Sequence, residues 1–571
     1  MKSETRICQN CKKDFMIEPE DFLFYEKIKV PAPTFCPECR MIRRMTWRNE
    51  RSLFKRTCDF TGESIITMFH PEVNIKVYDR DIWWSDKWDP TEYGQDYDFS
   101  KPFFEQYKEL LSKVPLQNLG NQNCVNSPYI NHSQELKNCY LVYASHIAED
   151  SSYSLGASKL KNCVDTYKLQ KSEQCYEDTI SDTLYDVHFS YNTYDSINSY
   201  FLNNCIGCQD CIGCINLRNK KYCILNVQYS KDDYIEIKNK LDLGSFKTLS
   251  EFKQKYKDFI LKHPRKYANL LKSTNCSGDN IINSKNIKNC FDSYGEVEDS
   301  KYLIHGLTMK DSYDCYGYGG IASLLYEGAD AGLKSYNQYF SVFTHSCINT
   351  NYTYMCYNAK NLFGCIGIRK GEYCILNKKY SKEEYEELVP KIIKHMNDMP
   401  YVDKNGIVYK YGEFFPSGLS PFAYNETIAQ EYFPKTVDEI LRSGNIYRKN
   451  PDRNYQITIK SEDLVDHIKD VDESIINETI ACPNKGSELT QCTFAYRITV
   501  EELFFLKRHN IALPRYCPNC RHYARLAQRN PMKLWHRSCM KEGCSNEFET
   551  SYAPERPEIV YCEKCYQGEV Y

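Results

Sequence analysis

The cysteines near both ends of the chain are spaced as ligands of a metal ion. Two cysteines separated by two residues form a tight turn that lets both sulfurs face one ion, and two such pairs make a tetrahedral zinc site. A structural cluster of thiols without metal is the alternative. The first set, which we expect to bind Zn²⁺, consists of Cys8, Cys11, Cys36 and Cys39.

Two further sets lie near the C-terminus, so we expect three zinc sites and no small-molecule cofactor. One has an opened first pair, with the loop PNKGSELTQ between its first two cysteines. The other combines a C-x4-C pair with a regular C-x2-C pair, a spacing that zinc sites allow. The expected ligands are Cys482, Cys492, Cys517 and Cys520 for one site, and Cys539, Cys544, Cys562 and Cys565 for the other.

The two ends are copies of one another, because the intervals between cysteines repeat. Beyond the first zinc site, the N-terminal copy has Asp79 and Asp81 where the last two cysteines of the C-terminal copy would be. We therefore expect a ribbon that has kept its shape and lost its metal. The interval from Cys11 to Cys36 equals that from Cys492 to Cys517, and the interval from Cys39 to Cys58 equals that from Cys520 to Cys539.

A basic segment directly follows each CPxCR motif. Arginines spaced by four lie on one face of a helix, and the planar guanidinium binds phosphate oxygens bidentately. This pattern predicts contact with the backbone of a nucleic acid, DNA or RNA, or with a ribonucleoprotein. The candidate residues are Arg40, Arg44, Arg48 and Arg56 in the first copy, and Arg521, Arg525, Arg529 and Arg537 in the second.

Two other interpretations of the basic segments remain open. The arginines could pair within their own module, and a protein partner could take the place of nucleic acid. The acidic residues available within the modules are Glu18, Glu20, Asp21, Glu501 and Glu502.

The central region repeats a small residue flanked by Asn, Asp or Lys and by Tyr every 10 to 13 positions, as in Asn138-Cys139-Tyr140 and Gln174-Cys175-Tyr176. Short strands at even spacing are typical of solenoids. We expect a mainly β fold with small α content. Its centre would be a duplicated parallel β-helix or β-solenoid-like repeat with coils of roughly 22 to 24 residues, flanked by the zinc-ribbon modules. An open β-sandwich or barrel is the alternative.

The central repeat is itself duplicated, since residues 211–234 match residues 363–385. This match bears on four cysteines whose C-x2-C-x2-C spacing is typical of an iron–sulfur cluster. Two of them correspond to Ala359 and Leu362, and a position that accepts Cys or an apolar residue packs a core. We therefore favour core packing over metal for Cys205, Cys208, Cys211 and Cys214.

The expected organisation has eight segments. They are an N-terminal zinc module at 1–60, a degenerate ribbon and linker at 61–118, a first solenoid copy at 119–229 and a helical cap at 230–274, then a second copy at 275–380, a helix at 381–397, an aromatic and proline-rich connector at 398–478, and a C-terminal double zinc module at 479–571.

Composition and motifs argue against several functional classes. The net charge of −3 excludes a globally polybasic protein. Without a secretory signal or a long apolar run we expect a cytoplasmic protein that does not engage a membrane. We find no catalytic set. The one candidate pair beside a zinc knuckle, Arg521 and His522, is not shared by the two copies, because Met41 stands at the position of His522 in the first. The interpretation leans away from an enzyme, with a carbohydrate-binding or carbohydrate-active solenoid and a protein–protein scaffold as alternatives.

Residues 8–44 resemble the zinc-ribbon domains of many uncharacterised bacterial proteins, through C-x2-C, an FxI…E…FY segment, a proline and CPxCRxxRR. Most of the chain resembles a large bacterial family of zinc-ribbon proteins. That resemblance depends on WWSDKWDP at 83–90, the Cys-rich centre, FAYNETIAQEYFP at 422–434 and the final YCEKCY. It implies the domain arrangement and no activity.

Overall fold

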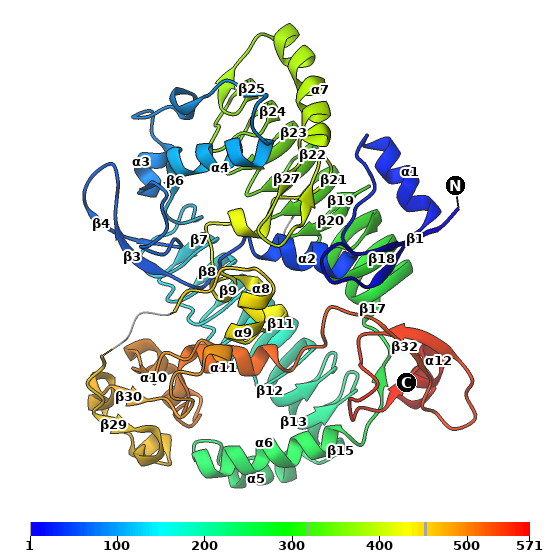
Figure 1. The fold of residues 1–571 in the computed structure, drawn as a ribbon. Coiled ribbons are helices and arrows are strands. Elements are labelled where there is room, and N and C mark those ends of the chain that lie inside the picture. The colour runs from blue at the N-terminus through cyan, green and yellow to red at the C-terminus, as the bar shows by residue number, and fades with distance from the viewer. Residues whose placement is uncertain (1, 318, 450–453, 571) are drawn as a thin grey trace.

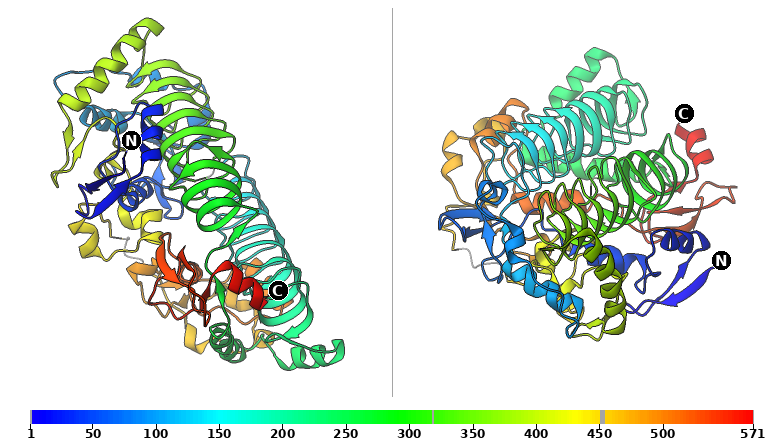
Figure 2. Two further views of the ribbon diagram at one scale, coloured as in Figure 1. Left: turned by 90° about the vertical axis from the view of Figure 1, so that its right-hand side faces the viewer. Right: turned by 90° about the horizontal axis from the view of Figure 1, so that it is seen from above.

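The computed structural model describes residues 2–317, 319–449 and 454–570. The fold is a mixed α/β structure with more strand than helix, built on two large, mostly parallel sheets of nine and ten strands. Figure 2 shows the strands of each sheet as successive turns of the chain piled on one another. Among the described residues, no helix is long and apolar enough to cross a membrane.

The first stack, defined as β7 to β15, advances by twelve residues per turn. Asp182 pairs with Tyr194, and Tyr194 pairs with Ile206. The coil expected from the sequence, about twice as long, is therefore wrong. The strands are β7 (Gln134–Lys137), β8 (His146–Glu149), β9 (Ser158–Lys161), β10 (Tyr167–Glu173), β11 (Thr179–His188), β12 (Tyr194–Asn203), β13 (Gln209–Ile215), β14 (Lys221–Ile224) and β15 (Val227–Gln228).

The second stack, defined as β17 to β26, has the same construction, with some turns one residue longer. Tyr313 pairs with Tyr326 and Tyr326 with Tyr339, whereas Tyr336 pairs with Ile348. The strands are β17 (Leu270–Leu271), β18 (Thr274–Lys301), β19 (Met309–Lys310), β20 (Tyr313–Tyr316), β21 (Ala322–Ala329), β22 (Tyr336–Val342), β23 (Ile348–Tyr354), β24 (Lys360–Phe363), β25 (Glu372–Ile375) and β26 (Lys378–Lys379).

A left-handed residue at every third position explains the short turn. In β11 and β12, and between them, positive φ angles fall at Asp186, Phe189, Asn192, Asp195 and Asn198. Asn and Asp adopt this conformation more readily than other side chains, which accounts for their frequency in the repeat. The residues that follow these five corners are small or apolar and are buried, namely Val187, Ser190, Thr193, Ser196 and Ser199.

The inward cysteines and serines hydrogen-bond to the backbone of the stack. The Cys205 thiol donates to the carbonyls of Asn203 and Cys214, at 3.5 and 3.6 Å. The Ser196 hydroxyl accepts from the backbone N–H of Cys208, one turn further on, at 3.1 Å. Cys205, Cys208, Cys211 and Cys214 are all buried in one core cluster. Within the described residues they are not among the groups whose ligand atoms converge on one point.

Helices follow the last turn of each stack. After the first stack come α5 (Lys231–Lys240) and α6 (Phe246–Ile260), and after the second comes α7 (Lys382–Asp398). The Tyr256 hydroxyl of α6 donates to the carbonyl of Cys214 at 3.4 Å. This contact seats α6 on the end of the first stack.

The two ends of the chain fold into modules of the same order. The N-terminal module contains β1 (Glu4–Ile7), β2 (Asp14–Ile17), α1 (Pro19–Lys27), α2 (Pro37–Met45), β3 (Phe54–Thr57), β4 (Ser64–Thr67), β5 (Val77–Tyr78) and α3 (Arg80–Trp84). The C-terminal module contains β30 (Ile480–Ala481), β31 (Ala495–Tyr496), α10 (Val500–Arg508), α11 (Pro518–Leu526), β32 (Trp535–Ser538), β33 (Glu547–Thr550), β34 (Val560–Tyr561) and α12 (Glu563–Val570).

The remaining elements connect these parts. Between the N-terminal module and the first stack lie α4 (Phe103–Lys113) and β6 (Leu116–Gln117), and β16 (Arg265–Lys266) precedes the second stack. The connector at 398–478 contains β27 (Tyr401–Val402), β28 (Val408–Tyr409), α8 (Ile428–Tyr432), α9 (Val437–Arg442) and β29 (Ile459–Lys460).

Each module touches both stacks in a crossed arrangement. The ribbon strand β5 pairs with β6, which leads into the first stack, while α2 packs on β20 and β21 of the second stack. In the C-terminal module β34 pairs with β16, which leads into the second stack, while α11 packs on β10 of the first. Figure 1 shows α2 and α11 lying against the stacks in this way.

Candidate metal centres and the arginine helices

Three groups of four cysteines each bring their sulfur atoms within 4.8 Å of one another. A tetrahedral zinc ion with bonds of about 2.3 Å to sulfur separates its ligands by about 3.8 Å. The structure has matching Sγ–Sγ distances of 3.7 Å for Cys11–Cys36, 3.8 Å for Cys482–Cys520 and 3.9 Å for Cys544–Cys562. The residues present therefore fit three metal ions of the zinc type, at the three expected sets of cysteines.

The three centres share the same hydrogen bonds to sulfur. In each, the backbone N–H of the third cysteine donates to the Sγ atom of the first, and an asparagine side chain donates to another Sγ. Such donors stabilise thiolates that bind a metal. The backbone donors are Cys36 to Cys8 at 3.3 Å, Cys517 to Cys482 at 3.4 Å and Cys562 to Cys539 at 3.3 Å, and the asparagines are Asn10, Asn484 and Asn546.

The centres differ in their exposure to solvent. Cys11 of the first centre is exposed, whereas all four cysteines of the second centre are buried. The inserted loop explains part of this burial, because Asn484 and Thr490 both contact the Sγ atom of Cys520, at 3.2 and 3.4 Å. The opened first pair thus makes a more enclosed site than the regular one.

The degenerate N-terminal ribbon keeps the hydrogen bond of a metal centre. The backbone N–H of Asp79 donates to the Sγ atom of Cys58 at 3.3 Å, as Cys562 does in the C-terminal copy. The carboxylate of Asp79 instead accepts from the N–H of Asp81 at 3.0 Å and caps α3. Asp79 therefore acts as a helix cap at the position of a ligand.

The second aspartate does not occupy a ligand position. Val77 and Tyr78 of β5 correspond to Val560 and Tyr561 of β34, since both pairs precede the residue that donates to sulfur. In this register the counterpart of Cys565 is Ile82. The expectation that Asp81 stands in its place is wrong, because Asp81 follows Asp79 by two residues whereas Cys565 follows Cys562 by three.

The arginines after the first knuckle face the second stack and are buried. Arg40 pairs with Asp314 at 2.9 Å, and Arg44 pairs with Asp314 at 3.1 Å and with Glu327 at 3.0 Å. Arg48 lies beyond the end of α2 and pairs with Glu50 at 2.5 Å and with Asp330. These guanidiniums are at most 3% exposed, so their charge is compensated inside the protein.

The second copy repeats this pattern on the first stack. Arg521 and Arg525 share Asp165, at 3.2 and 2.9 Å, and Arg521 also pairs with Glu502 at 2.6 Å. Arg529 pairs with Asp292 of the second stack at 3.0 Å. One aspartate of a stack is thus shared by two arginines of each helix, Asp314 by Arg40 and Arg44 and Asp165 by Arg521 and Arg525.

Arg56 and Arg537, one in each ribbon hairpin, donate to backbone carbonyls. Arg56 donates to the carbonyl of Ile75 at 3.1 Å, and Arg537 donates to that of Ala553 at 3.2 Å. Both side chains hold the loop that follows their hairpin. Of the eight arginines expected to contact nucleic acid, six therefore lie in two buried clusters, and the other two, Arg56 and Arg537, contact loops.

Sequence reasoning missed most acidic partners of these arginines. Among the partners expected within the modules, Glu502 contacts Arg521, whereas Asp21 pairs with Lys301 of the second stack at 2.7 Å. Asp165 and Asp314, each shared by two arginines, are the main partners instead. The sequence signal that could have indicated these partners is an acidic residue within the Tyr-rich repeat, where the side chains form a buried core.

A buried cluster joins the two stacks where the modules meet. Lys168 of the first stack contacts Asp292 and the Nδ1 atom of His305 in the second, the latter at 2.9 Å. Burial lowers the pKa of Lys168 to about 7, and burial likewise lowers the pKa of His305. The Lys168 side chain is only 6% exposed, and its contacts join the two stacks.

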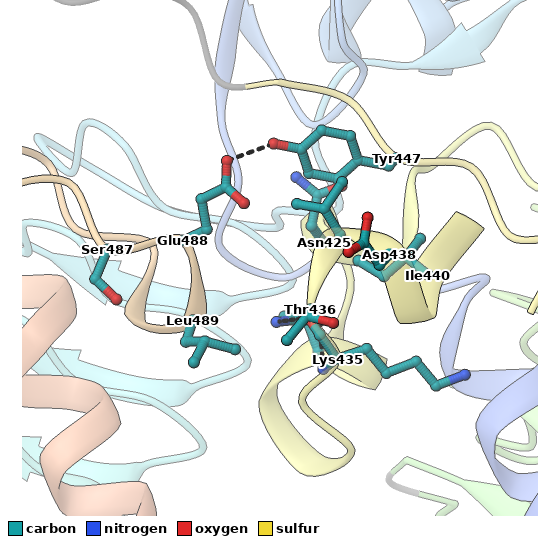
Figure 3. Close-up of a pocket in the computed structure, with 11 residues that line it drawn as sticks. Asn425, Lys435, Thr436, Asp438, Ile440, Tyr447, Ser487, Glu488 and Leu489 are labelled. Carbon is teal, nitrogen blue, oxygen red and sulfur yellow. Dashed lines mark hydrogen bonds between the residues drawn. The ribbon is translucent and has the colours of Figure 1, made fainter. Parts of the chain in front are cut away.

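Two clefts open between elements of the described structure. One, of about 390 Å³, lies between α9 and the inserted loop of the second metal centre (Figure 3). In it the Tyr447 hydroxyl donates to Glu488 at 2.6 Å, while Lys435 and Asp438 lie on the facing segment. We see no nucleophile paired with a base among the residues that line it.

The other cleft, of about 520 Å³, lies between the two stacks and α12. Its walls are rich in side-chain amides and tyrosines. Asn204 donates to the Tyr566 hydroxyl at 2.5 Å, and Asn192 donates to Asn269 across the gap at 3.3 Å. The polar lining includes Asn192, Tyr194, Asn204, Arg218, Lys266, Asn269, Lys272, Asn280, Tyr294 and Tyr566.

Comparison with known proteins assigns no family to the chain. No family model matches it, and no curated protein matches it. Among solved structures, the crystal structure of a "putative acetyltransferase" from Desulfovibrio desulfuricans aligns with 51% of this chain and 88% of that chain, at 8% identity and a TM-score of 0.10. A likeness this weak carries no argument about fold or function.

Proposed function

We propose that the protein is a non-enzymatic binding protein in which zinc modules clamp two stacks together, and that the cleft between the stacks takes a carbohydrate. We infer that each stack is a parallel β-solenoid with turns of about twelve residues, which the register of its strands supports. The metal ions would stabilise the modules without taking part in chemistry.

The lining of the inter-stack cleft is the observation that carries the proposal. The side-chain amides of Asn192, Asn204, Asn269 and Asn280 line the cleft and hydrogen-bond to one another, and Tyr194 and Tyr294 lie beside them. Amides can donate to and accept from hydroxyl groups, and a few polar groups in a partly apolar cleft of this size are typical of ligand sites. A neutral, hydroxyl-rich ligand fits this chemistry.

Single-stranded nucleic acid is the second candidate, at the same cleft rather than along the arginine helices. Lys266 and Lys272 lie at the cleft with Arg218, and one acid, Glu563, pairs with Lys266 at 2.7 Å. This local excess of positive charge favours phosphates. The buried arginines of α2 and α11 could bind phosphates only by breaking their ion pairs with carboxylates of the stacks.

The test is a binding assay with neutral oligosaccharides and with single-stranded DNA and RNA, each at two salt concentrations. Carbohydrate binding should change little with salt, whereas nucleic-acid binding should weaken steeply. Tyr294→Ala should weaken carbohydrate binding, and Tyr336→Ala, a half-exposed tyrosine outside the cleft, should not. Binding to nucleic acid alone, or to neither ligand, would reject the carbohydrate proposal.

The same assay also separates the cleft from the arginine helices. Reversing the charges of Arg521, Arg525 and Arg529 should disrupt folding of the C-terminal module, because Asp165 and Asp292 lose their partners. A folded variant that lost only nucleic-acid affinity would instead return the function to these helices.

A further inference from the structure

A fourth group of metal-ligating side chains lies away from the cysteine centres. Asp186 and His188 belong to β11 of the first stack, and His509 is the C-cap residue of α10 in the C-terminal module. The Nε2 atom of His188 and the Nδ1 atom of His509 lie 2.9 and 3.0 Å from the same carboxylate oxygen of Asp186. Two segments far apart in sequence thus meet at one point.

The three ligand atoms lie within 4.8 Å of one another, so a single cation could contact all of them. Two imidazole nitrogens and one carboxylate oxygen suit zinc and its neighbours in the first transition row. This donor set differs from the four thiolates of the cysteine centres. It would also leave coordination positions open, as four-cysteine centres do not.

The surroundings combine a buried floor with one open side. His188 is completely buried, whereas the Asp186 side chain is 29% exposed. Phe505 lies against His509, with ring centroids 4.4 Å apart, and Tyr200 lies 5.0 Å from His188. A cation could therefore enter past Asp186 and be shielded on its other side by aromatic rings.

The hydrogen bonding of the two imidazoles is incomplete. The Nδ1 atom of His188 and the Nε2 atom of His509 are buried without a hydrogen-bond partner. Each ring is therefore held through one nitrogen only, the one that faces Asp186. Buried polar atoms left without partners are rare and require an explanation. These two nitrogens point away from Asp186, and a cation bound at the facing nitrogens would not contact them.

We infer that Asp186, His188 and His509 form a fourth metal site, for Zn²⁺ or a similar divalent cation, that fastens α10 to the first stack. The site is independent of the function proposed for the cleft. Without a metal, the same residues would be a simple hydrogen-bonded cluster, and the experiment below distinguishes the two.

The experiment uses the full chain with its cysteine centres loaded with zinc, and adds Co²⁺ as the probe. We expect four metal ions per chain, three zinc and one cobalt. The cobalt should lack the strong thiolate charge-transfer absorption. His509→Gln should weaken cobalt binding at least about tenfold while three zinc ions remain. His146→Gln is the matched control, since His146 lies 3.7 Å from Glu135 on the same stack and outside the group.

Three outcomes decide the matter. A chain that takes up no cobalt, or a His509→Gln variant that binds it as the parent does, overturns the site. Loss of zinc from His509→Gln would mean that the module had unfolded. In that case the cobalt titration is repeated with Asp186→Asn, which preserves the shape of the side chain, in place of His509→Gln. Weakened cobalt binding with three zinc ions retained supports the site, and unchanged binding rejects it.

Discussion

The two terminal modules have the same order of elements but differ in how they are stabilised. The N-terminal module has one complete cysteine centre, with Cys11 exposed, and a ribbon in which Asp79 caps a helix. The C-terminal module has two complete centres, one of them fully buried. The larger arginine cluster, by contrast, belongs to the N-terminal module, because Arg43 adds a further buried guanidinium only in that copy. Metal centres and buried ion pairs are therefore alternative means of stabilising the same kind of module.

Loss of a metal centre should have the largest effect, and it should be larger in the C-terminal module. Structural zinc contributes on the order of 10 kcal/mol to folding. Cys517→Ser should unfold the C-terminal module, because Cys517 and the three other ligands of its centre are buried, whereas Cys11 is exposed and Cys11→Ser should leave the N-terminal module folded but weaker. Zinc content and thermal unfolding of the two variants measure this. Equal losses would mean that burial of the centre is irrelevant.

Removing one buried arginine should come next, with a larger cost in the N-terminal cluster. Arg44 bridges two buried carboxylates, whereas Arg525 meets one and leaves its Nε and Nη2 atoms without partners. Arg44→Met should lower the free energy of unfolding by about 3–5 kcal/mol, and Arg525→Met by less. Urea denaturation provides the values. Arg56→Met, which breaks contacts to carbonyls and a 3.9 Å ion pair with the partly exposed Asp59, is the control and should cost about 1 kcal/mol.

Acid should weaken both modules through buried histidines. Burial lowers the pKa of His132, which lies under the N-terminal module, to about 3, and that of His522 on α11 to about 3 as well. The folded protein then binds fewer protons than the unfolded chain between about pH 3 and 6.5. The free energy of unfolding should accordingly fall as the pH drops through that range.

The measurement is the urea midpoint at pH 7, 6 and 5. Replacing either histidine with Gln should flatten the dependence by about one proton. A midpoint that does not change between pH 7 and 5 would contradict the assignment.

The smallest effect should come from the interior cysteines of the stacks. Ser199 occupies the position of Cys211 one turn earlier, and its hydroxyl accepts from the N–H of Cys211 at 3.1 Å. Cys211→Ser should therefore cost about 1 kcal/mol or less and leave the zinc content unchanged. Loss of a metal ion in this variant would show that the interior thiols are ligands after all.

The metal centres could be located from sequence, since cysteine spacing is a local property that the chain displays directly. The arginine clusters could not be predicted, because Arg40 and Asp314 are far apart in the sequence, with the whole first stack between them, and meet only in the folded protein. The twelve-residue turn was also hidden. Its signal is the three-residue recurrence of Asn and Asp at left-handed corners, such as Asn192, Asp195 and Asn198, which the alternation of tyrosines obscures. The cluster around His509 joins a strand to a helix end and leaves no motif in the sequence.

The crossed arrangement of modules and stacks governs when the protein can finish folding during its synthesis. Helix α2 is made early, but its partners Asp314 and Glu327 are made only after more than half of the chain. Until then Arg40 and Arg44 have no compensating charge and cannot enter a core. The arginine face of the N-terminal module must therefore stay hydrated until Asp314 and Glu327 have been made. Long-range contacts of this kind slow folding, so the first residues to be made are among the last to be secured.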